Sequence, residues 1–457
     1  MINALEHASR HQQSHLAELI EFLRIPSVST QTDHDAETTS AAEWLAQAMT
    51  RAGLENIRII PTGRHPLVYS DWLHGGPEAP TVLIYGHYDV QPAEPFELWD
   101  THPFEPSIRG DYIYARGAAD DKGQLYIHVK AVEAYLQTAG TLPVNVKFII
   151  EGEEEIGSHS LSTFIPKNHA LLAADSALIS DSAMLAPGKP ALVYGLRGNC
   201  HLLMDITGPG RDLHSGSYGG GVNNPLNALA HFIARLKDER GHIMIPGFYD
   251  RVRPLTVDER EMLAHFPLDI DAWLPETGAP EVWGEPEYTL VERLGARPTL
   301  DVTGMYGGYI GKGTKTVLPS HAHAKISMRL VPDQDPAEIG ALFQEFARSV
   351  LPSSVKFAIQ IAGLSKPALL ARDTAPMRAA VAAYEATYRN EVVWMREGGS
   401  IPVVNQFQSD LKLPTVLMGF GLPGDHIHAP NERFYLPNFY AGIETSIRYL
   451  DALRHAR

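Results

Sequence analysis

Residues 81–92 read TVLIYGHYDVQP, so an apolar run ends abruptly in His87, Tyr88 and Asp89. The run has the length and character of a buried strand. Side chains alternate between the two faces of a strand, so His87 and Asp89 project together from its carboxyl end. Open α/β sheets bind their ligands at that end. The pair therefore suggests a functional site, although a hydrogen-bonded structural His–Asp pair would explain the same two residues.

The composition is that of an acidic globular protein. The chain has 457 residues, of which 44% are hydrophobic and 20% charged, and its formal net charge is -16. A chain of this length forms about two or three domains. The negative charge and the lack of a dense Lys/Arg cluster argue against nucleic acid or an anionic membrane as a partner. Cys200 is the only cysteine, which excludes an intrachain disulfide and favours a reducing compartment.

The N-terminal stretch MINALEHASRHQQSH lacks the basic and apolar regions of a signal peptide. No apolar run approaches the roughly 18 residues that are needed to span a bilayer. We therefore expect a cytoplasmic protein whose partners are neither nucleic acid nor membrane.

Strands alternate with helices in residues 1–193 and again in residues 367–457, which predicts a three-layer α/β/α domain built from both ends of the chain. Residues 194–366 have a strand–helix–strand pattern that predicts an inserted α+β domain, with residues 245–300 as an irregular, Pro- and Gly-containing insertion. The helices expected in the first domain cover residues 13–24, 38–53, 124–140, 375–388 and 434–456. The expected strands cover residues 55–60, 66–73, 81–89, 144–152, 174–181 and 413–421.

Other apolar strands are also followed by polar clusters. These clusters are Asp120 and Asp121 in GAADDKG, Glu151 and Glu153 to Glu155 in EGEEEIGS, Asp181 in ISDSA, and His426 and His428 in GDHIHAPNE. Each has a purely structural interpretation. An acidic run often begins a helix, where it interacts favourably with the helix dipole. A double Asp often caps a helix, and alternate histidines often share the exposed face of a strand, as we expect for His321 and His323.

The joint pattern is harder to explain structurally, because these strand ends meet at one edge if their strands share a sheet. Two like charges about 4 Å apart repel by roughly 4 kcal/mol at an effective dielectric near 20, so clustered carboxylates oppose folding unless cations neutralise them. Histidine with carboxylates suits zinc, or manganese, better than magnesium or calcium. Two such ions would activate a water and polarise a carbonyl. The converging residues are His87, Asp120, Glu154, Glu155, Asp181 and His428.

In this order, YGHYDVQP, ARGAADDKGQ, EGEEEIGS, ISDSA, DLHSGSYGG, REGGSIPV and HAPNE resemble the motifs of the M20 metallopeptidase family. They are most similar to its cytosolic non-specific and carnosine-type dipeptidases, and the resemblance spans nearly the whole chain. It implies a catalytic domain with an inserted lid or dimerisation domain, and a homodimer. It also implies two divalent ions per subunit, zinc first, with manganese or cobalt as alternatives. The reaction implied is hydrolysis of a dipeptide with a free C-terminal carboxylate, by a water activated between the ions.

The resemblance assigns five metal ligands. Asp120 would bridge the two ions, His87 and Asp181 would complete one site, and Glu155 and His428 would complete the other. In this family the peptide bond between Asp120 and the following residue is typically cis.

Two further acids have implied roles beside the metals. Glu154 would be the general base, and Asp89 would hold the ring of His87 as a ligand. The sequence departs from the family at Glu153, where a non-acidic residue is usual, but the positions of Gly157 and Ser158 favour Glu154 as base and Glu155 as ligand. His426 is a second candidate for the C-terminal ligand, although the HAPNE motif favours His428.

Four residues are implied to contact the substrate. His214 would stabilise the oxyanion, in dimeric relatives from the neighbouring subunit, and Thr316 matches a helper position. Arg329 would pair with the free carboxylate of the substrate, which a guanidinium fits bidentately. Ser400 would contact the same carboxylate. Without the resemblance, Arg329 could equally form a surface ion pair.

Other functions fit less well. The Gly-rich stretch at residues 307–316 fails the P-loop spacing, and no G-x-S-x-G nucleophile elbow occurs. An N-acyl-amino-acid deacylase or a carboxypeptidase would share the same metal site and differ only in its pocket. A non-enzymatic relative is disfavoured because all five ligands and the base are present.

Overall fold

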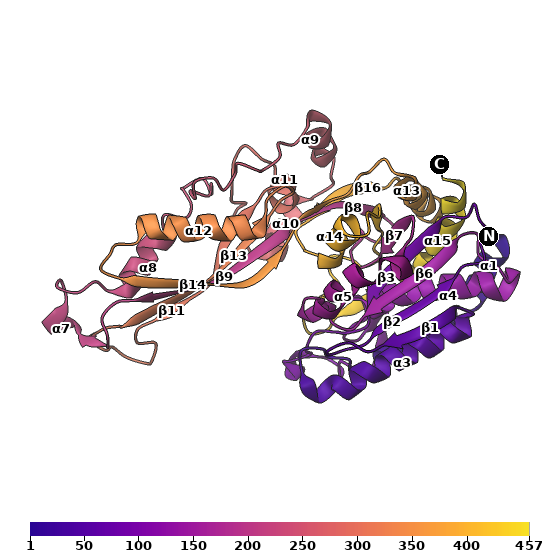
Figure 1. The fold of residues 1–457 in the computed structure, drawn as a ribbon, viewed down its shortest axis with the longest axis horizontal. Coiled ribbons are helices and arrows are strands. Elements are labelled where there is room, and N and C mark those ends of the chain that lie inside the picture. Colours follow the sequence, from indigo (N-terminus) through magenta and orange to yellow (C-terminus); the bar gives the residue numbers. More distant parts are fainter. Residues whose placement is uncertain (457) are drawn as a thin grey trace. The chain divides into compact units, whose positions relative to one another are not determined.

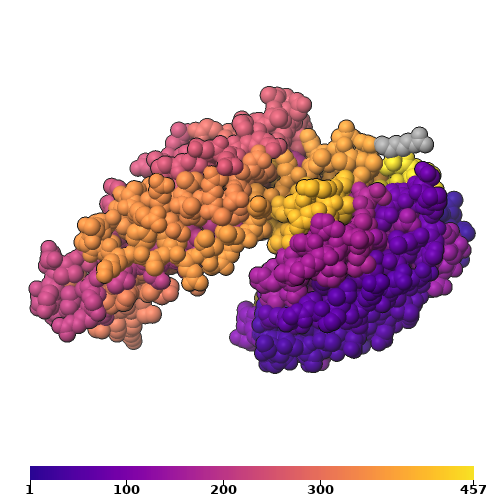
Figure 2. Space-filling model, in the orientation of Figure 1, coloured from indigo at the N-terminus to yellow at the C-terminus, as the bar shows by residue number. Residues whose placement is uncertain are grey.

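The computed structural model describes residues 1–456, which form two compact units. Unit 1 combines residues 1–194, 370–394 and 402–456, and unit 2 combines residues 195–369 and 395–401. In Figure 2 the C-terminal segment of unit 1, in yellow, lies against its N-terminal segment, in indigo and magenta. The predicted α/β domain built from both ends of the chain, with an inserted α+β domain, is confirmed.

A mixed sheet forms the centre of unit 1 (Figure 1). Its strands are β1 (Glu55–Ile60), β2 (Leu67–Trp72), β3 (Thr81–His87), β6 (Asn145–Glu151), β7 (Ser176–Ile179), β8 (Ala191–Leu196) and β17 (Thr415–Leu417). Their order is β1-β2-β6-β3-β7-β17-β8, and the short strands β15 (Ala368–Leu369) and β16 (Val393–Glu397) both pair with β8. Strands β6, β3, β7 and β17 run parallel. The carboxyl ends of these four strands therefore reach the same edge of the sheet.

Helices cover both faces of this sheet, as two neighbouring residues of β3 show. Side chains alternate along a strand, so Tyr85 and the position of Gly86 face opposite ways. The ring of Tyr85 meets Phe407 at 5.9 Å between centroids, whereas a side chain at Gly86 would meet Leu125. Phe407 and Leu125 belong to two different helices, so the sheet is the middle layer of three. Burial on both faces explains why the central strands are continuous apolar runs.

The helices of unit 1 follow the local sequence signals. They are α1 (Ile2–Arg10), α2 (Gln12–Leu23), α3 (Asp35–Ala52), α4 (Lys122–Ala139), α5 (His159–Phe164), α6 (His169–Leu172), α13 (Ala375–Tyr388), α14 (Pro402–Ser409) and α15 (Leu436–His455). Gly53 and Gly140 end α3 and α4 in the left-handed conformation, at φ 91° and 64°, which glycine adopts without steric cost. A small sheet of β4 (Ser107–Arg109), β5 (Tyr112–Tyr114) and β18 (Arg433–Tyr435) lies apart from the main one.

Unit 2 is built on an antiparallel sheet with its two longest helices on one face. Its strands are β9 (Gly198–Thr207), β11 (Thr299–Gly307), β13 (His321–Leu330) and β14 (Lys356–Ser365), in the order β11-β13-β9-β14. Helices α8 (Pro225–Ile233) and α12 (Pro336–Val350) pack on β9, and Phe232 of α8 meets Phe343 of α12 at 5.6 Å between ring centroids. Alternate residues of β13 are buried in this core, so Ser327 and Arg329 point to the other face.

Shorter elements complete unit 2. They are β10 (Leu213–His214), α7 (Ser215–Tyr218), β12 (Val317–Leu318), α9 (Val257–Ala264), α10 (Ile270–Thr277) and α11 (Leu290–Gly295). The chain passes between the units within β8 and β16 (Val393–Glu397), directly after β15 (Ala368–Leu369) and directly before α14. The expectation that residues 245–300 are irregular was wrong, because α9, α10 and α11 lie in this stretch. Among residues 1–456, no helix is both long and apolar enough to cross a membrane.

Candidate metal centre

Five side chains meet at the edge of the sheet where the parallel strands of unit 1 end. His87 ends β3, Asp120 precedes α4, Glu155 follows β6, Asp181 follows β7 and His428 follows β17. They form two groups that share Asp120, and within each group the candidate ligand atoms lie within 4.8 Å of one another. The common direction of the strands explains the convergence, because each strand delivers its following loop to the same place.

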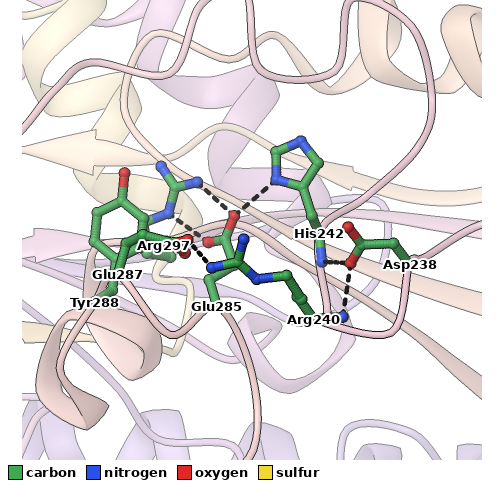
Figure 3. Close-up of a pocket in the computed structure, with 7 residues that line it drawn as sticks. All are labelled: Asp238, Arg240, His242, Glu285, Glu287, Tyr288 and Arg297. Atoms are coloured by element: carbon green, nitrogen blue, oxygen red, sulfur yellow. Dashed lines mark hydrogen bonds and ion pairs between the residues drawn. The ribbon is translucent and has the colours of Figure 1, made fainter.

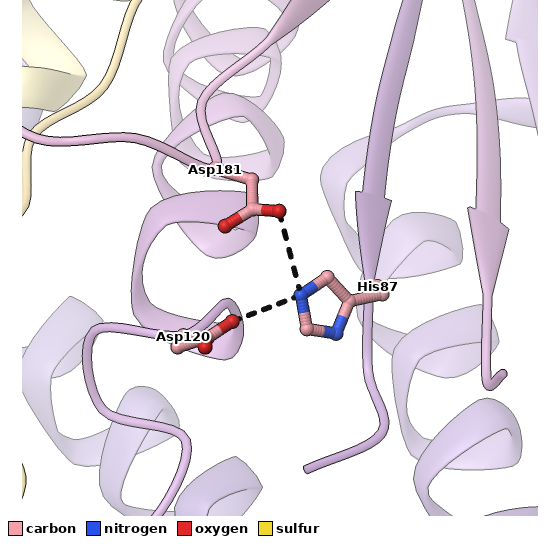
Figure 4. A group of neighbouring side chains, drawn as sticks. All are labelled: His87, Asp120 and Asp181. Atoms are coloured by element: carbon pink, nitrogen blue, oxygen red, sulfur yellow. Dashed lines mark ion pairs between the residues drawn. The ribbon is translucent and has the colours of Figure 1, made fainter. Parts of the chain in front are cut away.

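The first group consists of His87, Asp120 and Asp181 (Figure 4). His87 Nε2 lies 3.0 Å from Asp120 Oδ1 and 3.9 Å from Asp181 Oδ2. The His87 side chain is fully buried, whereas both carboxylates retain some exposure. The imidazole therefore forms the floor of the group and the two acids form its open side.

The second group consists of Asp120, Glu155 and His428. His428 Nε2 lies 2.9 Å from Asp120 Oδ2 and 3.3 Å from Glu155 Oε2. Asp120 thus turns one carboxylate oxygen to each group. Half of the His428 side chain is exposed, so the second group is the more open of the two.

The chemistry of these atoms fits a cation. His87 Nδ1 lies 3.1 Å from the backbone oxygen of Asp89, which can only accept a hydrogen bond, so we assign the ring proton to Nδ1. His87 Nε2 is buried and has no hydrogen-bond partner in the described chain, and its lone pair then faces the carboxylate oxygens of Asp120 and Asp181. Lone pairs that converge in this way are stabilised by a metal ion between them.

The electrostatics of the cluster support the same conclusion. Burial raises the pKa of Asp181 to about 7, and the charge of Asp120 adds to the rise. Burial also raises the pKa of Glu154 well above its ordinary value. Hydrogen bonds to Asp120 and Glu155 raise the pKa of His428 to about 10. These acids oppose one another's ionisation, and divalent cations would remove that conflict.

Asp89 is fully buried and organises the segments around it. Its carboxylate lies 3.4 Å from His87 Nδ1, and its backbone oxygen lies 3.1 Å from the same nitrogen. The backbone carbonyl of Asp89 therefore makes the shorter contact with the ring. The two carboxylate oxygens accept hydrogen bonds from the backbone N–H groups of Glu154 and Glu155, at 3.2 and 3.1 Å. Asp89 therefore positions the imidazole and the acidic segment after β6 together.

The neighbouring acid Glu153 has a structural position. Its buried carboxylate accepts hydrogen bonds from the backbone N–H groups of His65 and Ser160, and from the hydroxyl of Ser160. It takes part in neither metal-ligand group, and within the described chain His426 does not either. The peptide bond between Asp120 and Asp121 is cis, as the family resemblance implied.

Two supporting residues were not identified from the sequence. The buried carboxylate of Glu432 accepts hydrogen bonds from the backbone N–H groups of Gly117, Ala119 and Asp120, and pairs with the buried guanidinium of Arg116 at 2.7 Å. Gln91 Nε2 donates to Glu155 Oε2 at 2.8 Å. Glu432 lies in the HAPNE motif and Gln91 in YGHYDVQP, so their closeness to expected ligands was the available signal.

The four residues expected on the substrate side lie in unit 2 and form two pairs. His214 and Thr316 are exposed, and the backbone N–H of Ser215 donates to the backbone oxygen of Thr316 at 3.0 Å. Arg329 Nη1 lies 3.4 Å from Ser400 Oγ. The first pair adjoins the start of β13, because β10 pairs with β12 and β12 directly precedes β13, whereas Arg329 lies near the end of β13. The eight steps along the strand from His321 to Arg329 span about 26 Å at about 3.3 Å each, so the pairs are far apart within one chain.

Comparison with known proteins identifies the family. Residues 83–452 match the profile of "Peptidase family M20/M25/M40". The Beta-Ala-His dipeptidase of Mus musculus is 32% identical over 405 residues, which cover 86% of this chain and 82% of that protein. The Cys-Gly metallodipeptidase DUG1 of Saccharomyces cerevisiae is 32% identical over 453 residues, which cover 94% of each. The solved M20 family metallo-carboxypeptidase Sso-CP2 from Sulfolobus solfataricus has a TM-score of 0.87 at 33% identity, covering 96% of this chain and 99% of that one. The chain therefore belongs to peptidase family M20.

Proposed function

We propose that this protein is a dinuclear metallodipeptidase, which hydrolyses the peptide bond of dipeptides that have a free C-terminal carboxylate. The observation that carries the proposal is the pair of His/carboxylate groups that share Asp120. Relatives of similar length named as dipeptidases support the substrate class.

His87, Asp120 and Asp181 would hold one ion, and Asp120, Glu155 and His428 the other. Two divalent ions, when bound there, would lower the pKa of a water and polarise the scissile carbonyl. Imidazole with carboxylates favours zinc, with manganese or cobalt as alternatives. Asp89 would keep the ring of His87 oriented for this role, because it contacts the opposite ring nitrogen.

Glu154 would act as general base. It lies next to Glu155, and the hydrogen bond from its backbone N–H to Asp89 fixes the start of this segment. As the water oxygen adds to the carbonyl carbon, Glu154 would accept the water proton. It would then pass this proton to the leaving nitrogen as the C–N bond breaks, which yields two amino acids.

Arg329 and Ser400 would bind the C-terminal carboxylate, which makes a free carboxylate part of the substrate definition. His214 would donate to the developing oxyanion, with Thr316 beside it. The two pairs are separated along β13, which supports a homodimer in which the second copy supplies His214 and Thr316. We place this enzyme in the cytoplasm, where a chain with the single cysteine Cys200 needs no disulfide.

A carboxypeptidase is the second candidate, because Sso-CP2, at 33% identity, is described as a metallo-carboxypeptidase. The metal centre and the base would be the same. The difference would lie in whether the pocket accepts peptides longer than two residues.

The test measures amino-acid release from dipeptides, longer peptides and N-acyl amino acids, with and without a chelator. We expect chelator-sensitive cleavage of dipeptides, restored by zinc, manganese or cobalt, and two metal ions per chain by elemental analysis. Cleavage of longer peptides would favour the carboxypeptidase, and cleavage of acyl amino acids alone would favour a deacylase.

Glu154→Gln should retain metal and lose about 100-fold or more in kcat, whereas the exposed Glu43→Gln on α3 should match the wild type. Near-normal turnover by Glu154→Gln would remove it from the role of base.

A further inference from the structure

Unit 2 contains a cavity of about 430 Å³ on the face of its sheet opposite α8 and α12. The floor includes Asp301 of β11 and Arg329 of β13, and the walls include Trp273 of α10 and Trp283. Because Arg329 lines this cavity, the cavity is continuous with the position proposed above for the carboxylate of the substrate.

The charges that line the cavity are not balanced. Its cations are Arg197, Lys237, Arg293, Arg297 and Arg329, and its acids are Glu285 and Asp301. Asp301 pairs with Lys237 at 3.2 Å and Glu285 pairs with Arg297 at 2.7 Å. Among residues 1–456, the other three guanidinium groups have no carboxylate within ion-pair distance. In a chain with a net charge of -16, such a local excess of positive charge favours a negatively charged ligand.

A neighbouring cavity of unit 2 shows the contrasting arrangement (Figure 3). There Glu285 accepts two hydrogen bonds from Arg297, at 2.7 and 2.8 Å, and a further contact from His242 at 3.1 Å. Arg240 pairs with Glu287. The cationic groups of this neighbouring cavity are thus satisfied by the chain itself, which is typical of a structural network and not of an anion site.

Arg197 stands out among the unpaired cations. Its Nη1 is buried and has no hydrogen-bond partner in the described chain. It lines the same cavity as Arg329. Burial and the charge of Arg329 lower the pKa of Arg197 to about 10, so the two positive charges oppose each other. The hydroxyl of Ser400 donates to the backbone oxygen of Arg197 and lies 3.4 Å from Arg329 Nη1, so it links the backbone of Arg197 to the guanidinium of Arg329.

We infer that Arg197 is a second binding residue for the C-terminal carboxylate of the substrate, acting beside Arg329. A single carboxylate between the two guanidinium groups would relieve their repulsion and provide the missing partner for Nη1 of Arg197. Ser400 would complete the subsite. This inference rests on the proposed function, and it adds a residue to that site for which the sequence motif GLRG gave no indication.

The kinetic test compares a dipeptide with its C-terminal amide, using the ratio of their kcat/KM values. Arg197→Gln should reduce the preference for the free carboxylate about tenfold or more, mainly through KM, because a hydrogen bond to a charged group is lost. Arg197→Lys should restore part of the preference. Arg348→Gln, an exposed substitution on α12, should leave the preference for the free carboxylate unchanged.

If Arg197→Gln slows both substrates equally, Arg197 only supports the Ser400 segment and the inference is wrong. A loss confined to dipeptides that end in Asp or Glu would also overturn it, because Arg197 would then bind a side chain.

A binding measurement separates this inference from the proposed function. Equilibrium dialysis measures the affinity of the metal-loaded protein for labelled leucine and requires no turnover. Leucinamide, which lacks the free carboxylate, is the competitor. We expect leucine to bind about tenfold or more weakly to Arg197→Gln than to the wild type or Arg348→Gln. If the wild type cleaves no dipeptide, the proposed function fails, yet this comparison still decides whether Arg197 binds a carboxylate. Equal leucine affinity in all three proteins would rule that role out.

Discussion

Glu432 shows how one side chain can hold a metal centre without touching a metal. Its carboxylate binds three backbone N–H groups of the segment that carries Asp120, and Arg116 pairs with it in the interior. Glu432→Gln would leave the guanidinium of Arg116 buried without a counter-charge. We expect the free energy of unfolding to fall by about 3–5 kcal/mol, measured by urea denaturation. Metal affinity, measured by competition with a chelator, should fall about 10- to 100-fold.

The matched control is Glu444→Gln on α15, which breaks a more exposed pair with Arg448 one turn away. Such pairs stabilise helices by only about 0.3–0.5 kcal/mol. If the two variants lose similar stability, the buried Arg116–Glu432 pair does not stabilise the fold more than an exposed pair does. If Glu432→Gln is destabilised but binds metal normally, Glu432 does not position the Asp120 segment.

The sequence indicated which residues gather at this centre more clearly than how they are held. His87, Asp120, Asp181, Glu155 and His428 could be expected together because each follows a strand or precedes a helix of a parallel sheet. The contacts that hold them depend on tertiary structure. The partners of Glu153 lie near residue 65 and at Ser160, and the N–H donors to Glu432 lie more than 300 residues away. No local pattern encodes such distances.

At the scale of elements, His128 joins α4 to its neighbours. Its Nδ1 lies 3.0 Å from Ser446 Oγ on α15, and its Nε2 lies 2.7 Å from Ser180 Oγ at the end of β7. Because the Ser180 hydroxyl donates to the backbone oxygen of Met418, the proton of neutral His128 belongs on Nε2. Burial lowers the pKa of His128 to about 3, so this connection requires the uncharged ring.

This pKa makes the helix packing sensitive to acid. An unfolded histidine has a pKa near 6.5, so between about pH 6.5 and 3 only the unfolded chain binds this proton. The contribution of His128 to the free energy of unfolding is complete above pH 6.5 and falls by about 1.4 kcal/mol per pH unit below it. His128→Gln lacks this titration. The stability difference between wild type and variant, measured by urea denaturation with chelator present, should therefore shrink by about 2–3 kcal/mol from pH 7 to 4.5. An unchanged difference would contradict a neutral buried ring.

Helices and strands were predictable where long apolar patterns mark them in the sequence. Such patterns predict the strands β1, β2, β3, β6, β7 and β17 and the helices α3, α4, α13 and α15, and glycine caps mark the ends of α3 and α4. The short helices of residues 245–300 were missed because Pro and Gly recur throughout the stretch, although the start signals of these helices are present in the sequence. Thr256 caps α9, and Thr289 forms a capping box with Glu292 at the start of α11. A helix of six or eight residues has too little periodicity to stand out beside such breakers.

At the scale of the whole molecule, unit 2 separates residues that one active site would need together. His214 pairs with Val317 in the short β10–β12 ribbon, which precedes β13, whereas Arg329 lies near the end of β13 and contacts Ser400. A strand is stiff, so the separation of about 26 Å along it is a fixed property of the chain. If both pairs serve the same substrate, they must come from different copies. A symmetric dimer would bring His214 of one copy to the Arg329 of the other, which a single chain cannot do along one strand.

Mixed dimers of two inactive variants test this arrangement. Glu154→Gln lacks the base but retains His214, and His214→Ala lacks the oxyanion donor but retains Glu154. In a mixed dimer, the site built on the His214→Ala chain has its own Glu154 and receives His214 of the partner subunit, so one of the two sites is intact. Random assembly makes half of the dimers mixed, so co-refolded variants should recover about a quarter of the wild-type activity.

The two single variants, each refolded alone, provide the baseline activities, and sedimentation should show a dimer. Activity no higher than the sum of the two baselines would mean that each site takes His214 from its own chain.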